Sequence, residues 1–305
     1  MGVRARLLHN LGGDFYGIGK VKLGILCSRI RLEEKLIFKA LRERGVEYER
    51  LDERHLAFQL QANGLAQGYD LIWCRSISHS HALYALSILN GWGIRTVNSY
   101  QVVRTCGDKV LTSMALIRNN VPTPRTVVAL TIESAMEAIE EMGYPVVLKP
   151  AVGSWGRLLS RVNDRDTAEA VLRHKATLGG PLHSVFYIQE YVDKPGRDIR
   201  TLVIGDEVVY AMYRRSDHWI TNTARGGEAR PCLLSPEIEE LSLAAAQAVG
   251  GGILAVDLME TADGCLLVNE VNHTPEFHGA MQAVGVDIAG KMADYVLQQV
   301  LITPA

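Results

Sequence analysis

The chain has 305 residues, of which 48% are hydrophobic and 22% are charged. This is ordinary globular composition, with enough length for two or three structural units. A formal charge of −2 excludes a large positive field, so we expect neither a nucleic-acid partner nor a membrane surface. No apolar run approaches the roughly 18–20 residues of a membrane span. The scattered cysteines form no CxxC pair and indicate no zinc site. We therefore expect a cytoplasmic protein.

The first 20 residues contain several glycines and two arginines, but no apolar stretch of the kind found in signal peptides. We interpret them as a disordered extension. From residue 21 to about 98, apolar runs alternate with helical patterns, for example Val21–Ser28 followed by Arg31–Arg44. Strands that alternate with helices predict a parallel α/β sheet, so we assign residues 21–98 to an N-terminal domain of this type.

The middle of the chain, residues 99–192, again mixes helices and strands. A helical segment carries Asp108 and Lys109, and the runs Val146–Ala151 and Phe186–Val192 have the composition of buried strands. We assign this region to a central subdomain.

The last region, residues 193–305, has an antiparallel pattern. Strand candidates flank the tight turns Gly205-Asp206 and Asp263-Gly264. Helical patterns at Ser235–Val249 and Ile288–Val300 are expected to pack on this sheet. The predicted fold class is therefore α/β, with an α+β arrangement in the C-terminal part.

Two carboxylates and an amide converge in the second hairpin. Strand alternation places Asp257 on one face of the first strand, and Glu270 and Asn272 on one face of the second. With Asp263-Gly264 as a two-residue turn, Asp257 pairs with Glu270, and their Cβ atoms lie ~5 Å apart, which is destabilising for like charges. A hard divalent cation would offset this repulsion, and oxygen ligands favour magnesium or manganese over zinc. Solvated acids, or a pair that shares a proton, are the alternatives.

A lysine and a glycine loop upstream suit a phosphate group. Lys149 ends an apolar strand, and the loop Gly153-Ser154-Trp155-Gly156-Arg157 follows soon after it. Glycines let backbone N–H groups approach an anion closely, although such loops are also common in plain turns. The chain has no GxxxxGK[ST] motif and no GxGxxG fingerprint, which excludes a P-loop and disfavours a Rossmann oxidoreductase.

Two further segments have polar groups that suit a nucleotide or its substrate. The strand through Gln189-Glu190-Tyr191-Val192 could offer backbone groups to an adenine edge, and Asp198 could accept hydrogen bonds from ribose hydroxyls. The segment Thr223–Gly227 is a second flexible, cationic loop. Singly, such segments are more often structural than functional.

The order of these motifs resembles that of the ATP-grasp ligases, especially the RimK-like branch. DK, VLKP, GSWGR, QEYV, GRDIR, TARGG, and then D followed by NEVN occur in this order over about residues 21–303. Within that branch the chain is most similar to the LysX family, through stretches such as LGILCSRIRLEEK, QEYVDKPGRDIRTLVIG and LLVNEVNHTPEF. The resemblance implies an ATP-grasp fold, an N-terminal pre-ATP-grasp domain, and ATP between the central and C-terminal subdomains.

The resemblance also implies a role for each residue that matches a motif. ATP-binding roles fall on Lys109, Lys149, Gly153, Ser154, Trp155, Gly156, Arg157, Gln189, Glu190, Tyr191, Val192, Asp198, Arg200 and Asn222. Substrate contacts fall on Arg214, Thr223, Arg225, Gly226 and Thr274, and catalytic roles on Arg225 and Lys149. The ligands of Mg2+, expected as two ions, are Asp257, Glu270 and Asn272.

The implied reaction joins α-aminoadipate to the C-terminal glutamate of a LysW-type carrier protein through an acyl phosphate, for lysine biosynthesis. Alternatives are a glutamate–carrier ligase for arginine biosynthesis, a glutamate ligase acting on a cofactor or peptide, and an ATP-binding regulatory module without turnover. A carrier would need a local basic surface, for which the candidates are Arg214, Arg215, Arg225 and Arg230. We also expect a homo-oligomer.

Overall fold

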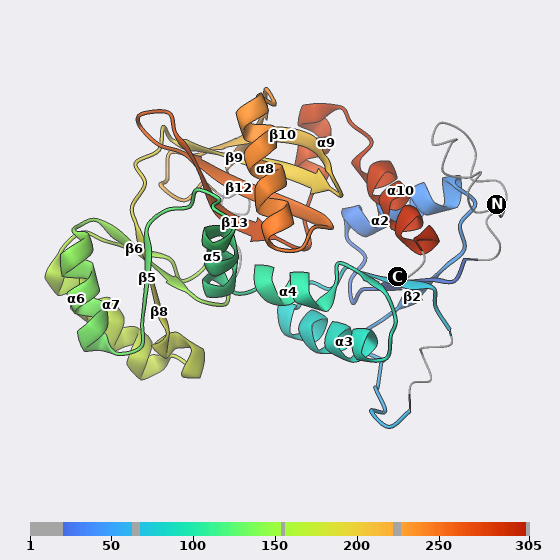
Figure 1. The fold of residues 1–305 in the computed structure, drawn as a ribbon, viewed down its shortest axis with the longest axis horizontal. Coiled ribbons are helices and arrows are strands. Elements are labelled where there is room, and N and C mark those ends of the chain that lie inside the picture. Colours follow the sequence, from blue (N-terminus) through green and yellow to red (C-terminus); the bar gives the residue numbers. More distant parts are fainter. Residues whose placement is uncertain (1–20, 63–67, 154–155, 222–226, 303–305) are drawn as a thin grey trace. The chain divides into compact units, whose positions relative to one another are not determined.

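The computed structural model describes residues 21–62, 68–153, 156–221 and 227–302, which form two compact units (Figure 1). The first unit contains the described residues up to Tyr100, together with Glu276–Met281 and the described residues from Gly285 onward. The second unit contains the described residues of Gln101–Pro275, together with the short segment Gln282–Val284. The C-terminal end of the chain therefore returns to the unit in which the N-terminal part lies.

The first unit is built on a parallel sheet with the strand order β2-β1-β3-β4. Its elements are β1 (Leu23–Leu26), α2 (Leu32–Glu43), β2 (Tyr48–Leu51), β3 (Leu71–Cys74), α3 (His79–Gly91) and β4 (Thr96–Val97). Strands β1 and β3 are buried along their whole length, as expected of a parallel sheet that is covered on both faces. The predicted N-terminal parallel sheet is confirmed.

The C-terminal helix α10 (Ile288–Leu301) also belongs to the first unit, where it packs on α2 and β3 (Figure 1). The guanidinium of Arg44 binds the Asp294 carboxylate through two contacts of 2.6 and 2.8 Å. Arg95 donates to the carbonyl of Gln299, near the end of the helix, at 2.8 Å. The prediction that this helix packs on the C-terminal antiparallel sheet is therefore wrong, because helical periodicity identifies an apolar face but not its partner.

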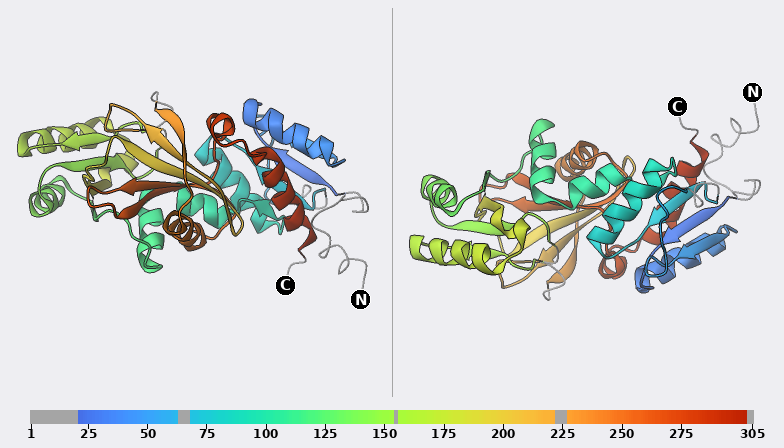
Figure 2. Two further views of the ribbon diagram at one scale, coloured as in Figure 1. Left: turned by 90° about the horizontal axis from the view of Figure 1, so that it is seen from above. Right: turned by 90° about the horizontal axis from the view of Figure 1, so that it is seen from below.

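The second unit contains a four-stranded antiparallel sheet with the order β5-β8-β6-β7. Helices α6 and α7 lie side by side against this sheet (Figures 1 and 2). Val146, Leu148 and Ile188 face these helices in one apolar core, so Val147 and Lys149 face the other way. The elements of this part of the chain are α4 (Tyr100–Cys106), α5 (Lys109–Arg118), β5 (Thr126–Ala129), α6 (Ile132–Met142), β6 (Val146–Pro150), β7 (Ser160–Val162), α7 (Arg165–Leu178), the 3-10 helix η1 (Pro181–Ser184) and β8 (Phe186–Glu190).

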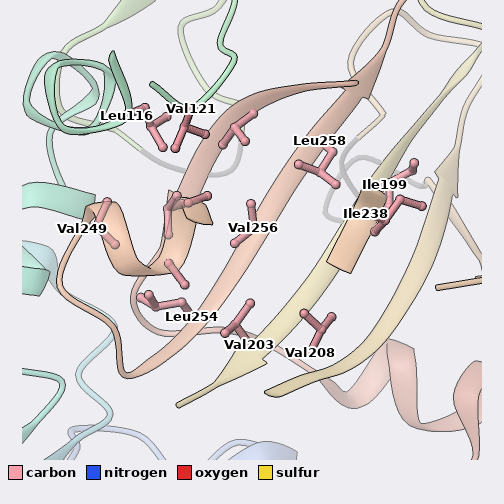
Figure 3. Packing of buried hydrophobic residues seen from close by; sticks show 14 of the residues in the cluster. Leu116, Val121, Ile199, Val203, Val208, Ile238, Val249, Leu254, Val256 and Leu258 are labelled. Atoms are coloured by element: carbon pink, nitrogen blue, oxygen red, sulfur yellow. The ribbon is translucent and has the colours of Figure 1, made fainter. Parts of the chain in front are cut away.

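The same unit contains a five-stranded antiparallel sheet with the order β11-β10-β9-β12-β13. Val203, Leu254, Val256 and Leu258 form an apolar face that packs with Ile238 of α8 (Figure 3). The opposite face of this sheet carries Asp198, Arg200, Arg214 and Asp257. The elements are β9 (Arg197–Ile204), β10 (Glu207–Arg215), β11 (Glu228–Cys232), α8 (Pro236–Ala248), β12 (Ile253–Glu260) and β13 (Leu266–Asn272), and α9 (His278–Val284) follows them in the chain.

The β12–β13 hairpin confirms the predicted pairing of Asp257 with Glu270, but its turn differs from the prediction. Thr261 donates its N–H to the Cys265 carbonyl at 2.9 Å, so three residues, not two, form the turn. This shifts the register by one residue, and a β-bulge that leaves Asn269 unpaired in the ladder shifts it back. The longer turn and the bulge cancel each other, so counting back from a two-residue turn still pairs Asp257 with Glu270.

No helix among the residues described is both long and apolar enough to cross a membrane.

Candidate active site

A cavity of about 800 Å³, counting its open mouth, is lined by residues from both sheets of the second unit. The lining residues are Lys109, Val147, Lys149, Pro150, Gly153, Gly156, Arg157, Leu159, Gln189, Glu190, Tyr191, Val192, Lys194, Asp198, Trp219, Ile220, Thr221, Met259, Asn269, Glu270 and Asn272.

Two lysines line this cavity, of which Lys149 is buried and Lys109 is half-buried. Lys149 is on the face of β6 opposite the α6–α7 core, is 6% exposed, and donates from Nζ to Oδ1 of Asn269 at 2.8 Å. Lys109 is the first residue of α5, which Asp108 caps by accepting from two backbone N–H groups. Its Nζ donates to the Gly153 carbonyl at 2.8 Å. Among the described residues, neither ammonium has a carboxylate oxygen within 4.0 Å.

The surroundings of these lysines favour an anionic ligand. Burial lowers the pKa of Lys149 to about 8. The positive charges of Lys109 and Lys194 lower this pKa further, whereas the negative charge of Glu270 raises it. Burial likewise lowers the pKa of Lys109. A charged group that is poorly solvated is stabilised strongly by a ligand of opposite charge. The pair is therefore suited to hold the phosphates of a nucleotide.

Another part of the cavity wall is more apolar and aromatic. Strand β8 ends at Glu190, and the following residues Tyr191 and Val192 line the cavity with Trp219 and Met259. The Tyr191 and Trp219 rings meet edge to face, with centroids 6.5 Å apart. Such a wall suits a flat, apolar ring system such as a nucleobase.

A ladder of buried charges crosses the polar face of the five-stranded sheet. Asp257 of β12 is opposite Glu270 on one side and Arg200 on the other. Arg200 binds both oxygens of Asp257, at 2.7 and 2.8 Å. Arg214 contacts the same carboxylate at 3.1 Å and binds both oxygens of Asp198 at 2.6 and 2.7 Å.

These contacts correct one step of the sequence argument. Burial alone would raise the pKa of the Asp257 carboxyl, but the guanidiniums of Arg200 and Arg214 outweigh it and hold that pKa well below its usual value. The charge of Asp257 is thus balanced by two arginines, and a cation is not the only way to offset its repulsion from Glu270.

The residues present nevertheless fit a hard cation. Glu270 and Asn272 line the cavity, and the Asn272 amide lies 3.2 Å from a Glu270 oxygen. Asp257 is on the same sheet face, and an ionised carboxylate has about four lone-pair sites, so its arginine contacts do not exhaust it. In the part of the chain that is described, no group of three or more His, Cys, Asp or Glu side chains is placed to hold a metal. A cation here would therefore depend on asparagine and on phosphate oxygens, as Mg2+ often does.

The structure brings together many of the residues singled out from the sequence. Those that line the cavity are Lys109, Lys149, Gly153, Gly156, Arg157, Gln189, Glu190, Tyr191, Val192, Asp198, Glu270 and Asn272. Arg200, Arg214, Asp257 and Thr274 are not among its lining residues. Ser154, Trp155, Asn222, Thr223, Arg225 and Gly226 lie outside the described residues. The hydroxyl of Thr274 contacts the ring of His273 at 2.8 Å.

The prediction of a basic surface for a carrier is wrong for one of its four arginines, Arg214. Arg214 is 1% exposed, because it is committed to the charge ladder, and it cannot contribute to a surface. Arg230 is exposed but pairs with Glu228 at 2.7 Å. Arg215 is exposed.

Sequence reasoning missed several lining residues, among them Lys194, Trp219, Thr221, Met259 and Asn269. A signal existed for Met259, because strand alternation places it on the same face as Asp257. Alternation gave no signal for Asn269, although this residue opens the NEVN motif, because simple alternation places it on the face opposite Glu270. Only the bulge brings both residues to the same cavity.

Two family models cover most of the chain. A RimK-like ATP-grasp domain matches residues 106–296, and a LysX preATP-grasp domain matches residues 23–105. The chain belongs to the RimK-like ATP-grasp family. It is an ATP-dependent ligase, and ligases of this fold use ATP and Mg2+.

The similar proteins agree with this assignment. Glutamate–LysW ligase ArgX of Sulfurisphaera tokodaii is 34% identical over 280 residues, which covers 90% of this chain and 98% of that protein. α-Aminoadipate–LysW ligase LysX of Saccharolobus solfataricus is 32% identical over 260 residues, covering 85% and 94%. A crystal structure of a RimK domain ATP-grasp protein from Sphaerobacter thermophilus has a TM-score of 0.78 at 28% identity, covering 91% of this chain and 100% of that one. The predicted ATP-grasp fold and LysX-family resemblance are confirmed.

Proposed function

We propose that this ligase joins the amino group of α-aminoadipate to the C-terminal glutamate side chain of a LysW-type carrier protein, in cytoplasmic lysine biosynthesis. The observation that carries the proposal is a pair of lysines, the buried Lys149 and the half-buried Lys109, that line a cavity without a carboxylate partner within 4.0 Å among the described residues. The names of the similar ligases, which act on LysW, support the choice of carrier.

The first step transfers the γ-phosphoryl group of ATP to the carrier. A carboxylate oxygen of the carrier attacks the γ-phosphorus, the bond to the bridging oxygen breaks, and ADP leaves with that electron pair. Lys109 and Lys149 bind phosphate oxygens and offset their charge, since phosphoryl transfer depends mainly on positioning and electrostatics. Mg2+, proposed as two ions held by Asp257, Glu270 and Asn272, would neutralise charge on the phosphates.

The second step forms the amide. The amine nitrogen of the amino acid attacks the acyl carbon, the C–O bond to phosphate breaks, and the departing phosphate takes up the proton that the amine loses. Arg225 is proposed to stabilise the oxyanion on the tetrahedral intermediate.

Glutamate on the same carrier is the second candidate, because the identity of this chain to ArgX is as high as its identity to LysX. Glutamate is one methylene shorter than α-aminoadipate, and a pocket discriminates such a difference by only ~1–3 kcal/mol. A preference, rather than an absolute choice, is therefore expected.

The test supplies ATP, Mg2+ and the carrier together with each acidic amino acid in turn, and follows ADP release and the mass of the carrier. We expect a mass increase by one amino-acid residue, with α-aminoadipate preferred by kcat/KM. A preference for glutamate would move the assignment to arginine biosynthesis. Turnover without a carrier would reject both carrier functions and favour a ligase for a cofactor or peptide.

A further inference from the structure

The bulge in β13 gives Asn269 a position that regular strand geometry does not allow. Val268 pairs with Leu258 and Glu270 pairs with Asp257, so Asn269 has no opposite residue in β12. Adjacent residues of a regular strand face opposite sides, yet Asn269 and Glu270 both line the cavity.

The segment before β5 holds the strand at this point. The backbone N–H of Val268 donates to the Pro122 carbonyl at 2.8 Å, and the Thr123 hydroxyl donates to the Val268 carbonyl at 2.8 Å. Both backbone groups of Val268 are therefore bonded directly beside the bulge. These bonds restrain the backbone that carries Asn269.

Asn269 reaches across the cavity to the other sheet. Its Oδ1 accepts a hydrogen bond from Lys149 Nζ at 2.8 Å, and the two residues are 120 positions apart in the chain. A lysine side chain has many rotamers, and ordering it has an entropic cost. The amide therefore restricts the ammonium to one place in the cavity.

The chemistry of this acceptor is as important as its position. A neutral amide orients the ammonium without cancelling its charge, and a lysine has two more N–H donors for other acceptors. A carboxylate at the same place would form an ion pair and compete with phosphate. We propose that Asn269 is a positioning residue that holds Lys149 ready for a nucleotide phosphate. The inference rests on the phosphate-binding role proposed for Lys149.

A double-mutant cycle tests the coupling. The affinity for ADP is measured by calorimetry without Mg2+, for the unaltered protein, Asn269→Leu, Lys149→Met and the double variant. We expect Asn269→Leu to weaken ADP binding by about tenfold, as loss of a hydrogen bond to a charged group does. In the Lys149→Met background the same change should have less than about a twofold effect.

Two further variants separate positioning from a merely structural role. Asn269→Asp keeps the shape and the acceptor but adds a negative charge, so a structural role would be preserved while ADP binding should still weaken by about tenfold or more. Asn119→Leu is the matched control, because Asn119 is exposed at the C-terminal cap of α5 and donates to the Ala115 carbonyl of that helix. We expect its ADP affinity to be unchanged, and thermal denaturation checks that every variant is folded.

The outcomes distinguish this inference from the proposed function. If Lys149→Met leaves ADP affinity unchanged, the phosphate-binding role of Lys149 is rejected. If Lys149→Met weakens binding but Asn269→Leu does not, or weakens it equally in both backgrounds, the positioning role of Asn269 is rejected.

Discussion

At the scale of single residues, Lys149 shows how burial changes the pKa of a side chain that is placed to bind a phosphate. Alternation along β6 and the apolar neighbours predict that an unusual lysine lies at the end of this strand. The sequence does not predict its counterpart, since Asn269 comes from another sheet and reaches the cavity only through a bulge. Local chemistry can thus be anticipated, whereas the pairing of distant side chains depends on backbone irregularities that no periodicity encodes.

The first prediction concerns pH. The pKa of Lys149 is lowered by burial to about 8 from 10.5, so its ammonium loses its proton as pH rises through about 8. We expect ADP affinity to fall over this range in the unaltered protein, and to fall less in Lys149→Arg, whose guanidinium stays charged. Calorimetry between pH 7 and pH 9.5, roughly one to two units around the shifted pKa, measures this. A flat profile in the unaltered protein would contradict it.

The same lowering of the Lys149 pKa affects stability. The folded state disfavours the charged lysine, so between about pH 8 and 10.5 the unfolded chain binds more protons than the folded one. The contribution of Lys149 to the free energy of unfolding therefore rises with pH in that window.

The second prediction concerns Glu270. Glu270→Gln keeps the size of the side chain but removes the negative charge that a cation in this cavity needs. We expect kcat to fall by more than about 100-fold, because charge neutralisation on the phosphates is lost. The melting temperature should change little. Turnover at the normal rate, measured as ADP release at saturating Mg2+, would reject the metal role.

At the scale of secondary-structure elements, the β12–β13 hairpin shows both the strength and the limit of pattern reasoning. Alternation correctly brings Asp257 and Glu270 together on one face. The predicted turn is one residue too short, and the bulge compensates for the difference. The contacts of Arg200 and Arg214 with Asp257 do not follow from the pattern. Strands β9 and β10 are recognisable as a hairpin, but the pairing of β9 with β12 is not.

The third prediction tests this ladder. Arg214→Met leaves the buried carboxylates of Asp198 and Asp257 without one of their guanidinium partners. We expect a loss of about 3–5 kcal/mol in the free energy of unfolding, as for other broken buried ion pairs. The neighbouring Arg215 is exposed, so Arg215→Met should change stability by less than about 0.5 kcal/mol. If denaturant unfolding shows the same change in stability for Arg214→Met and Arg215→Met, the ion pairs of Arg214 do not stabilise the sheet.

At the scale of the whole molecule, motif order predicts the fold class and the family, because several separated motifs rarely occur in one fixed order by chance. The partner of helix α10 is predicted wrongly, since the chain returns to its N-terminal unit at the end. Contacts between segments so far apart in sequence leave no trace in local periodicity. The division into central and C-terminal subdomains at residues 192 and 193, and the homo-oligomer, stay predictions.

The most direct test of the central claim asks whether the carrier carboxylate is activated before the amine attacks. The ligase is incubated with ATP, Mg2+ and the LysW-type carrier, without amino acid, and hydroxylamine is added to trap an acyl phosphate. We expect ADP release and a carrier with the mass of a hydroxamate at its C-terminal glutamate. Lack of a carrier hydroxamate would contradict it.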